Sequence, residues 1–449
     1  MTLLPDKPLT RGVLKISTPA VAGLSSQMIV SVVETAMVGR LENTEVILAA
    51  MGLGLLATWA ITSVFSALAT GTHVLVARRY GENDHAGAGD VLNNALLLSL
   101  AIGILMGAIG WFFSYEILDF FASDNAVAVA GTSYMQWRFF GLLFFLFIVS
   151  YRGFFNGIGH THVFMYSAII VNLANIVFNY LLIFGALGFP EMGLAGAGVA
   201  SVVSNAIGCV FFVSATFLPS YRKTYKYYSQ LNVRKLVLKQ IIKISTPVSF
   251  QSILILLGFL VFVAIAGIIG TLEQAASQVV LTALFMSFLP CFGFGIGAQT
   301  LVGQSIGNGD HPLAKRLGLE AARLATYFTV FLGALFVFFP DAVTGVITTN
   351  ADVADMARPI LRIAGVAQIF YASGIVLAHA LQAAGATVYV MTIEVLTHWV
   401  IFLPVCYLFG VTLGGGILGA WMALPIYIIS YSGLMYAKYR KDSWLLIKV

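Results

Sequence analysis

Charged residues are scarce in this chain of 449 residues. Lys, Arg, Asp and Glu make up 10% of it, whereas soluble globular proteins carry roughly 25%, and 59% of its residues are hydrophobic. A soluble globular protein is therefore excluded. The apolar residues form runs longer than the ~20 residues that cross a bilayer as a helix, and these runs lack the strict alternation of a membrane β-barrel. We expect an all-α membrane protein.

Cysteine is also rare, and nucleotide-binding motifs are absent. The cysteines, Cys209, Cys291 and Cys406, each lie inside an apolar run, which excludes a disulfide framework and a cysteine metal site. The sequence contains no Gly-x-x-x-x-Gly-Lys-Ser/Thr loop, and no polar segment is long enough for a nucleotide-binding domain. We expect no enzyme, no cofactor and no nucleic-acid partner. Any transport must run on an ion gradient.

Long apolar segments predict twelve membrane spans. They lie at about 13–38, 46–76, 91–117, 128–155, 162–187, 193–219, 241–270, 276–303, 316–339, 357–382, 388–412 and 416–437. Lys and Arg gather on one side of these spans, whereas the loops of the other side carry mainly Asp and Glu. By the positive-inside rule both termini are cytoplasmic, and the first span is retained rather than cleaved as a signal peptide. We expect a monomeric, multi-pass protein of the cell (inner) membrane, surrounded by the lipid bilayer.

Short motifs of the first half recur in the second half at nearly one sequence offset. The pairs are 15–19 with 243–247, 81–85 with 307–311, Gly159 with Gly385, and 193–197 with 416–420. Each half contains an even number of spans, so the two halves have the same topology, and we expect a cavity where they meet. The expected division is an N-terminal six-helix lobe at 1–220, a cytoplasmic linker at 221–243 and a C-terminal six-helix lobe at 244–449.

Polar side chains within the spans of the first half suggest an ion site. A carboxylate near the middle of a bilayer costs about 2.5–3.5 kcal/mol by insertion scales, so Glu34 must face protein or a cavity. Asn175 and Asn179 share one helical face, and Ser201 lies on the next span. Their oxygens can hydrogen-bond a carboxyl group or bind a hard cation such as sodium. We predict one proton or cation site centred on Glu34; a brace between helices is the alternative.

Glu394 and His398 are the titratable pair of the second half. They are four residues apart, so on a regular helix their side chains meet and can relay protons. By the repeat offset, neither residue has a counterpart in the first half. A coupling role and a buried structural pair remain open alternatives.

These motifs together resemble the multidrug and toxic compound extrusion (MATE) family, and in particular its NorM-like branch. The similar segments are 33–39 in span 1, 152–161 at the end of span 4, Asn175 with Asn179 in span 5, 196–201 in span 6 and 398–404 in span 11. The resemblance covers nearly the whole chain. It implies two six-helix lobes that form a V around a central cavity. It also implies export of amphipathic, often cationic, compounds by antiport with protons or sodium.

The resemblance also implies roles for individual residues. The residues that it places at the first-lobe cation site are Glu34, Asn175, Asn179 and Ser201. NorM-like members carry a glutamate in span 7 and an aspartate in span 10, where this chain has Gln251 and about Tyr371. A second-lobe sodium site of that kind is therefore not expected. Glu394 and His398, with Gln251, are the candidates for coupling in the second lobe.

We therefore expect a secondary active multidrug exporter of small, cationic organic compounds, driven by protons or by sodium. A lipid-linked saccharide flippase of the same superfamily is the first alternative. It requires a cationic cavity, but the arginines within the spans, Arg138 among them, are expected near span ends. An integral membrane enzyme or a passive channel is disfavoured, because the repeated halves carry no catalytic constellation and the carboxylate faces a closed lobe.

Overall fold

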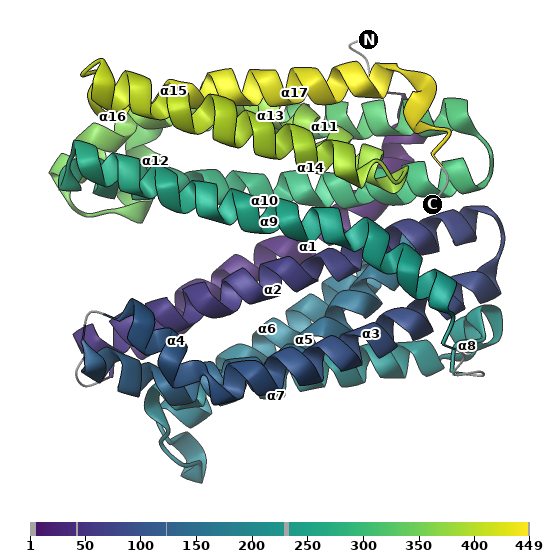
Figure 1. Ribbon diagram of the computed structural model, residues 1–449, viewed down its shortest axis with the longest axis horizontal. Helices are drawn as coiled ribbons and strands as arrows, with labels where there is room; N and C mark the ends of the chain where they lie inside the picture. Colours follow the sequence, from purple (N-terminus) through teal and green to yellow (C-terminus); the bar gives the residue numbers. More distant parts are fainter. Residues whose placement is uncertain (1–5, 42–43, 123, 229–232, 448–449) are drawn as a thin grey trace. The chain divides into compact units, whose positions relative to one another are not determined.

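The computed structural model describes residues 6–41, 44–122, 124–228 and 233–447. In this part of the chain every regular element is a helix, and twelve helical segments are long and apolar enough to span a membrane (Figure 1). The predicted all-α class and the predicted twelve spans are confirmed.

The spans follow the apolar runs closely. The first six are α1 (Lys7–Val38), α2 (Thr44–Gly81), α3 (His85–Phe112), α5 (Asn125–Gly157), α6 (Thr161–Ile183) and α7 (Gly193–Phe217). The next four are α9 (Lys235–Ile269), α10 (Thr271–Gly307), α11 (His311–Phe338) and α13 (Ala351–Ala383). The eleventh combines α14 (Thr387–Leu396), η2 (Thr397–Phe402), α15 (Leu403–Tyr407) and η3 (Leu408–Thr412), and the twelfth combines α16 (Gly416–Trp421) and α17 (Ala423–Arg440). Short helices between or after them are α4 (Ser114–Phe121), η1 (Ala186–Gly188), α8 (Pro219–Tyr225), α12 (Pro340–Ile347) and η4 (Asp442–Trp444).

The contacts divide the chain into two units. The N-unit is Ala22–Ser249, and the C-unit comprises the residues up to Val21 together with those from Phe250 onward. These boundaries differ from the predicted lobes at 1–220 and 244–449, because α1 and α9 each contribute to both units. The start of α1 bonds to α11, where Thr10 donates to Glu320 at 2.7 Å. The part of α9 up to Ser249 belongs with α2, where Ser249 donates to the carbonyl of Val64 at 2.7 Å. Residues 229–232 of the predicted linker 221–243 lie outside the described residues.

One helix forms the centre of each unit. In the N-unit α5 packs against α2, α3 and α7, and in the C-unit α13 packs against α10, α11 and α17. No other span has a more buried apolar stretch than α5 and α13, among the residues described. Each of the two is followed by a glycine in the left-handed region, Gly159 with φ of 81° and Gly385 with φ of 89°. The sequence repeat is thus visible in the packing of both units.

The motifs 81–85 and 307–311 mark equivalent helix starts. Asp84 caps α3 by accepting from the backbone N–H of Gly87 at 2.8 Å, and Asp310 caps α11 by accepting from Leu313 at 2.9 Å. A carboxylate at this position satisfies a backbone donor that the first turn leaves unpaired. The repeated motif therefore fixes where the third span of either half begins.

The eleventh span departs from the regular helix expected over 388–412. π-helical turns occupy η2 and η3, on either side of α15. Pro404 lies at the start of α15 and has no N–H for the carbonyl four residues before it, so the regular hydrogen-bond pattern cannot continue through it. A π turn also rotates the following side chains out of α-helical register. Spacing along the sequence therefore does not determine which side chains meet in this span.

Candidate functional site

A cavity of about 260 Å³ lies inside the N-unit. Its walls come from α1, α2, α5, α6 and α7, and its polar lining includes Gln27, Glu34, Thr58, Thr62, Arg138, Asn172, Asn175 and Ser201. Glu34 and Arg138 are the charged side chains of this lining, among the residues described. Three of the four residues predicted for the first-half site, namely Glu34, Asn175 and Ser201, line this one cavity.

Glu34 lies on α1 with 7% of its surface exposed. Its Oε1 atom is buried and has no hydrogen-bond partner among the described residues. Buried polar atoms are nearly always paired, so an unpaired carboxylate oxygen in a polar cavity calls for a functional explanation. A proton or a cation would satisfy it.

The asparagines and the serine form a chain of hydrogen bonds beside Glu34. The Nδ2 of Asn179 donates to the Oδ1 of Asn175 at 2.8 Å, and the Nδ2 of Asn175 approaches the Oγ of Ser201 at 3.5 Å. Asn175 and Ser201 line the cavity, whereas Asn179 is fully buried and orients Asn175. The structure thus brings together the side chains that the spacing on two separate spans suggested.

Arg138 is a charged residue of the cavity that the sequence analysis missed. It was expected near a span end, but α5 begins at Asn125, and at 1.5 Å per residue Arg138 lies about 20 Å along the helix. Its Nη1 donates to the Oγ of Ser201 at 3.2 Å, and its guanidinium stands 5.8 Å from the centre of the Tyr134 ring. Arg138 and Glu34 line the same cavity. The expectation that Arg138 lies near a span end, away from the cavity, is therefore wrong. Its position well inside the predicted span 128–155 could have indicated this from the sequence.

In the C-unit Glu394 bonds to residues other than His398. Its Oε2 accepts from the Nε2 of Gln251 at 2.5 Å and from the hydroxyl of Tyr431 at 3.5 Å. No hydrogen bond joins Glu394 to His398 among the residues described. The imidazole of His398 packs instead against the rings of Phe402 and Tyr427, at 5.1 and 5.6 Å between centroids. The expected Glu394–His398 pair is therefore not formed, because the π turn η2 changes the register between them.

Glu320 on α11 is a buried acid that the sequence analysis did not select. Only 2% of it is exposed, and it accepts from Thr10 at 2.7 Å and pairs with Arg323 at 2.9 Å. Both carboxylate oxygens thus have a partner: Oε1 accepts from Thr10, and Oε2 pairs with Arg323. Glu320 joins the start of α1 to α11 by a hydrogen bond. Its carboxylate is fully paired, whereas one oxygen of Glu34 has no partner among the described residues.

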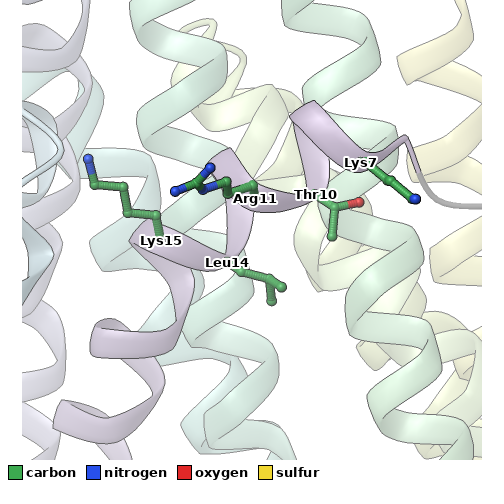
Figure 2. A pocket seen from close by; sticks show the side chains of 5 residues that line it. All are labelled: Lys7, Thr10, Arg11, Leu14 and Lys15. Atoms are coloured by element: carbon green, nitrogen blue, oxygen red, sulfur yellow. The ribbon is translucent and has the colours of Figure 1, made fainter.

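A second cavity, of about 430 Å³, is lined by the first turns of α1. Figure 2 shows its side chains, Lys7, Thr10, Arg11, Leu14 and Lys15. They include three cations and no acid, so the charge of this lining does not favour a cation. Basic side chains at a helix end suit the phosphate region of a membrane surface.

Comparison with known proteins agrees with this arrangement. The MatE family model matches residues 19–181 and 247–408, one segment in either half. "Probable multidrug resistance protein NorM" of Thermotoga maritima is 25% identical over 439 residues, which cover 97% of this chain and 93% of that protein. "Uncharacterized transporter YisQ" of Bacillus subtilis is 23% identical over 445 residues, which cover 97% and 95%.

Solved structures share the fold. One is a MOP superfamily transporter from Pyrococcus furiosus, described by the reverse polarity of its binding pocket. It has a TM-score of 0.90 at 19% identity, and the match covers 98% of this chain and 97% of that chain. A multidrug resistance MATE family transporter in an outward-facing conformation has a TM-score of 0.88 at 19% identity, with 96% of both chains covered. At these identities the likeness shows the fold alone.

Proposed function

The chain belongs to the MatE family, and from this premise we propose that it exports small amphipathic organic cations from the cell by antiport with a cation bound at Glu34. The observation that carries the proposal is the unpaired Oε1 of Glu34, which is buried beside a polar cavity inside one unit. The name of the Thermotoga maritima relative, a multidrug resistance protein, supports the class of substrate.

Coupling follows from the charge of Glu34. When its carboxylate is ionised, it attracts a positively charged substrate; when an ion neutralises it, that attraction is lost. Ion and substrate then favour different states of the cavity, which is the condition for exchange of one against the other. The hydrogen bonds between Asn179, Asn175 and Ser201 fix the positions of the polar side chains that line the cavity with Glu34.

The coupling chemistry lies within one chain, so we propose that the protein works as a monomer in the cell membrane. The cavity draws all its lining from the N-unit. Both termini lie in the cytoplasm on this proposal, because the basic side chains of α1 and the last turn of α17 carry the positive charge typical of that side.

Arg138 gives one argument for the second candidate, a lipid-linked saccharide flippase. A pyrophosphate needs cationic side chains, and Arg138 lines the cavity. However, Glu34 lines the same cavity and balances this charge, whereas a pyrophosphate requires a net positive site. Transport of a fluorescent organic cation by reconstituted protein supports the exporter; transport of a lipid-linked pyrophosphate instead supports the flippase.

Replacement of Glu34 tests the proposed function. Glu34→Gln removes the ionisable group at nearly constant volume, and we expect it to abolish gradient-driven efflux of an organic cation from proteoliposomes while the protein still inserts and folds. Glu116→Gln is the matched control, because Glu116 is an exposed residue of α4 outside the cavity, and we expect it to transport as the unmodified chain does. Full efflux by Glu34→Gln would refute the role of Glu34.

A further inference from the structure

The proposed function leaves the coupling ion open between proton and sodium. We infer that Arg138 is a selectivity residue, which acts as a built-in cation beside Glu34 and keeps sodium out of the cavity, so that the proton drives transport. This inference rests on the proposed function and concerns the same cavity.

The charge of the cavity is the first argument. Of the five helices that line it, α1 contributes Glu34 and α5 contributes Arg138, while the polar residues from α2, α6 and α7 are threonines, asparagines and serines, which carry no charge. Tyr134, beneath Arg138, is uncharged at neutral pH. With Glu34 ionised, the described lining is therefore balanced. A sodium ion, which unlike an organic cation has no apolar surface to bury, would add a second positive charge in a site that water screens poorly.

The hydrogen bonds are the second argument. A hard cation needs several oxygen ligands with free lone pairs. Two N–H donors, from Arg138 and Asn175, already point at the Oγ of Ser201, at 3.2 and 3.5 Å. The Oδ1 of Asn175 accepts from Asn179 at 2.8 Å. Donors thus take both lone pairs of the Ser201 hydroxyl and one of the two lone pairs of the Asn175 oxygen, which leaves fewer ligands for sodium.

A proton also adds one positive charge, but it is bound far more strongly than sodium and does not meet the second obstacle. It forms a covalent O–H bond with one carboxylate oxygen and needs no coordination shell, and the Oε1 of Glu34 is buried without a partner among the described residues. Its uptake leaves Arg138 as the uncompensated charge of the cavity. The same charge that excludes sodium then repels a cationic substrate, so Arg138 also strengthens the exchange of proton for substrate.

Transport by the full chain in proteoliposomes tests the inference, with a fluorescent organic cation as substrate. One arm imposes a pH gradient in sodium-free buffer, and the other imposes a sodium gradient at equal pH. We expect efflux in the first arm, and in the second no more than without a gradient. Efflux driven by sodium alone in the unmodified chain overturns the inference, and so does saturable binding of radioactive sodium to the purified protein.

Two substitutions separate the charge of Arg138 from its shape. Arg138→Gln keeps an N–H donor for Ser201 but removes the charge, and we expect it to gain sodium binding and sodium-driven efflux. Arg138→Lys keeps the charge, and we expect it to remain unresponsive to sodium. A sodium response in the lysine variant, or none in a folded glutamine variant, contradicts the inference. If the glutamine variant does not fold, the two gradients applied to the unmodified chain still decide.

The failure of this inference is distinguishable from failure of the proposed function. If sodium drives the unmodified chain and Glu34→Gln abolishes that efflux, only the assignment of Arg138 is wrong. If Glu34→Gln transports fully with either gradient, the proposed coupling site itself is wrong.

Discussion

At the scale of single residues, the two acids selected within the spans differ in what surrounds them. Glu34 has a buried oxygen with no partner among the described residues and lines a cavity. Glu394 accepts from Gln251 on α9 and from Tyr431 on α17. A paired carboxylate stabilises helix packing, whereas an unpaired one is available to an ion. We therefore propose that Glu394 braces three helices and that coupling resides at Glu34.

Glu394→Gln is expected to keep gradient-driven efflux close to that of the unmodified chain, since its amide oxygen can still accept from Tyr431. Glu394→Leu leaves two donors without an acceptor, which should lower the free energy of unfolding by about 1–3 kcal/mol. Proteoliposome transport and chemical unfolding in detergent measure the two effects. Loss of efflux in Glu394→Gln with unchanged stability would place a coupling residue in the C-unit as well.

Residues of the site could be predicted from the sequence where a polar side chain lies inside an apolar run, because a bilayer makes such a side chain costly. Glu34, Asn175 and Asn179 stand out because polar groups are costly inside apolar runs, and their spacing indicates their shared face. Arg138 did not stand out, because it was placed near a span end, from which a long side chain can reach the interface, although its position within the predicted span 128–155 indicated otherwise. The hydrogen bond from Arg138 to Ser201 depends on how α5 packs on α7, and no spacing along the chain reports this packing.

At the scale of secondary structure elements, α1 is fixed at its start by a buried acid. Thr10 donates to Glu320, which Arg323 neutralises from the same helix. Charge-assisted hydrogen bonds of this kind are stronger than neutral ones. The beginning of α1 is thereby held to α11, while Glu34 lies farther along the same helix in the N-unit.

Thr10→Val is expected to lower the free energy of unfolding by about 1.5–3 kcal/mol, because Glu320 loses a hydrogen bond to its buried charge. Thr246→Val is the matched control: the hydroxyl of Thr246 is exposed and donates at 2.7 Å to the carbonyl of Ile242 within α9 itself. We expect the control to change stability by less than about 0.5 kcal/mol. Equal losses in both variants, measured by chemical unfolding in detergent, would show that the bond to Glu320 adds nothing.

The existence of the helices followed from apolar runs, but the caps Asp84 and Asp310 start two of them at His85 and His311, ahead of the predicted 91 and 316. The interior of the eleventh span was not predictable in the same way. Its π turns, η2 and η3, lie on either side of the short helix whose first turn contains Pro404, and no periodicity of the sequence indicates them. The predicted contact between Glu394 and His398 assumed regular α geometry and was wrong for that reason.

At the scale of the whole molecule, charge is distributed unequally between the ends of the spans. α2 begins with Glu45 in its first turn and ends with Arg78 and Arg79 in its last. The last turn of α17 carries Lys438 and Arg440, whereas α10 and α13 begin with acids. Positively charged loops stay in the cytoplasm during insertion, which predicts the orientation of the chain in the membrane.

Labelling of introduced cysteines tests this orientation. Cys209, Cys291 and Cys406 are all buried, so the unmodified chain should give a low background with a membrane-impermeant maleimide. Glu191 and Lys223 are exposed, on opposite sides of the membrane by the charge distribution. We expect Glu191→Cys to be labelled in intact cells, and Lys223→Cys to be labelled only after the membrane is permeabilised. The reverse pattern would place both termini outside and would refute the proposed orientation.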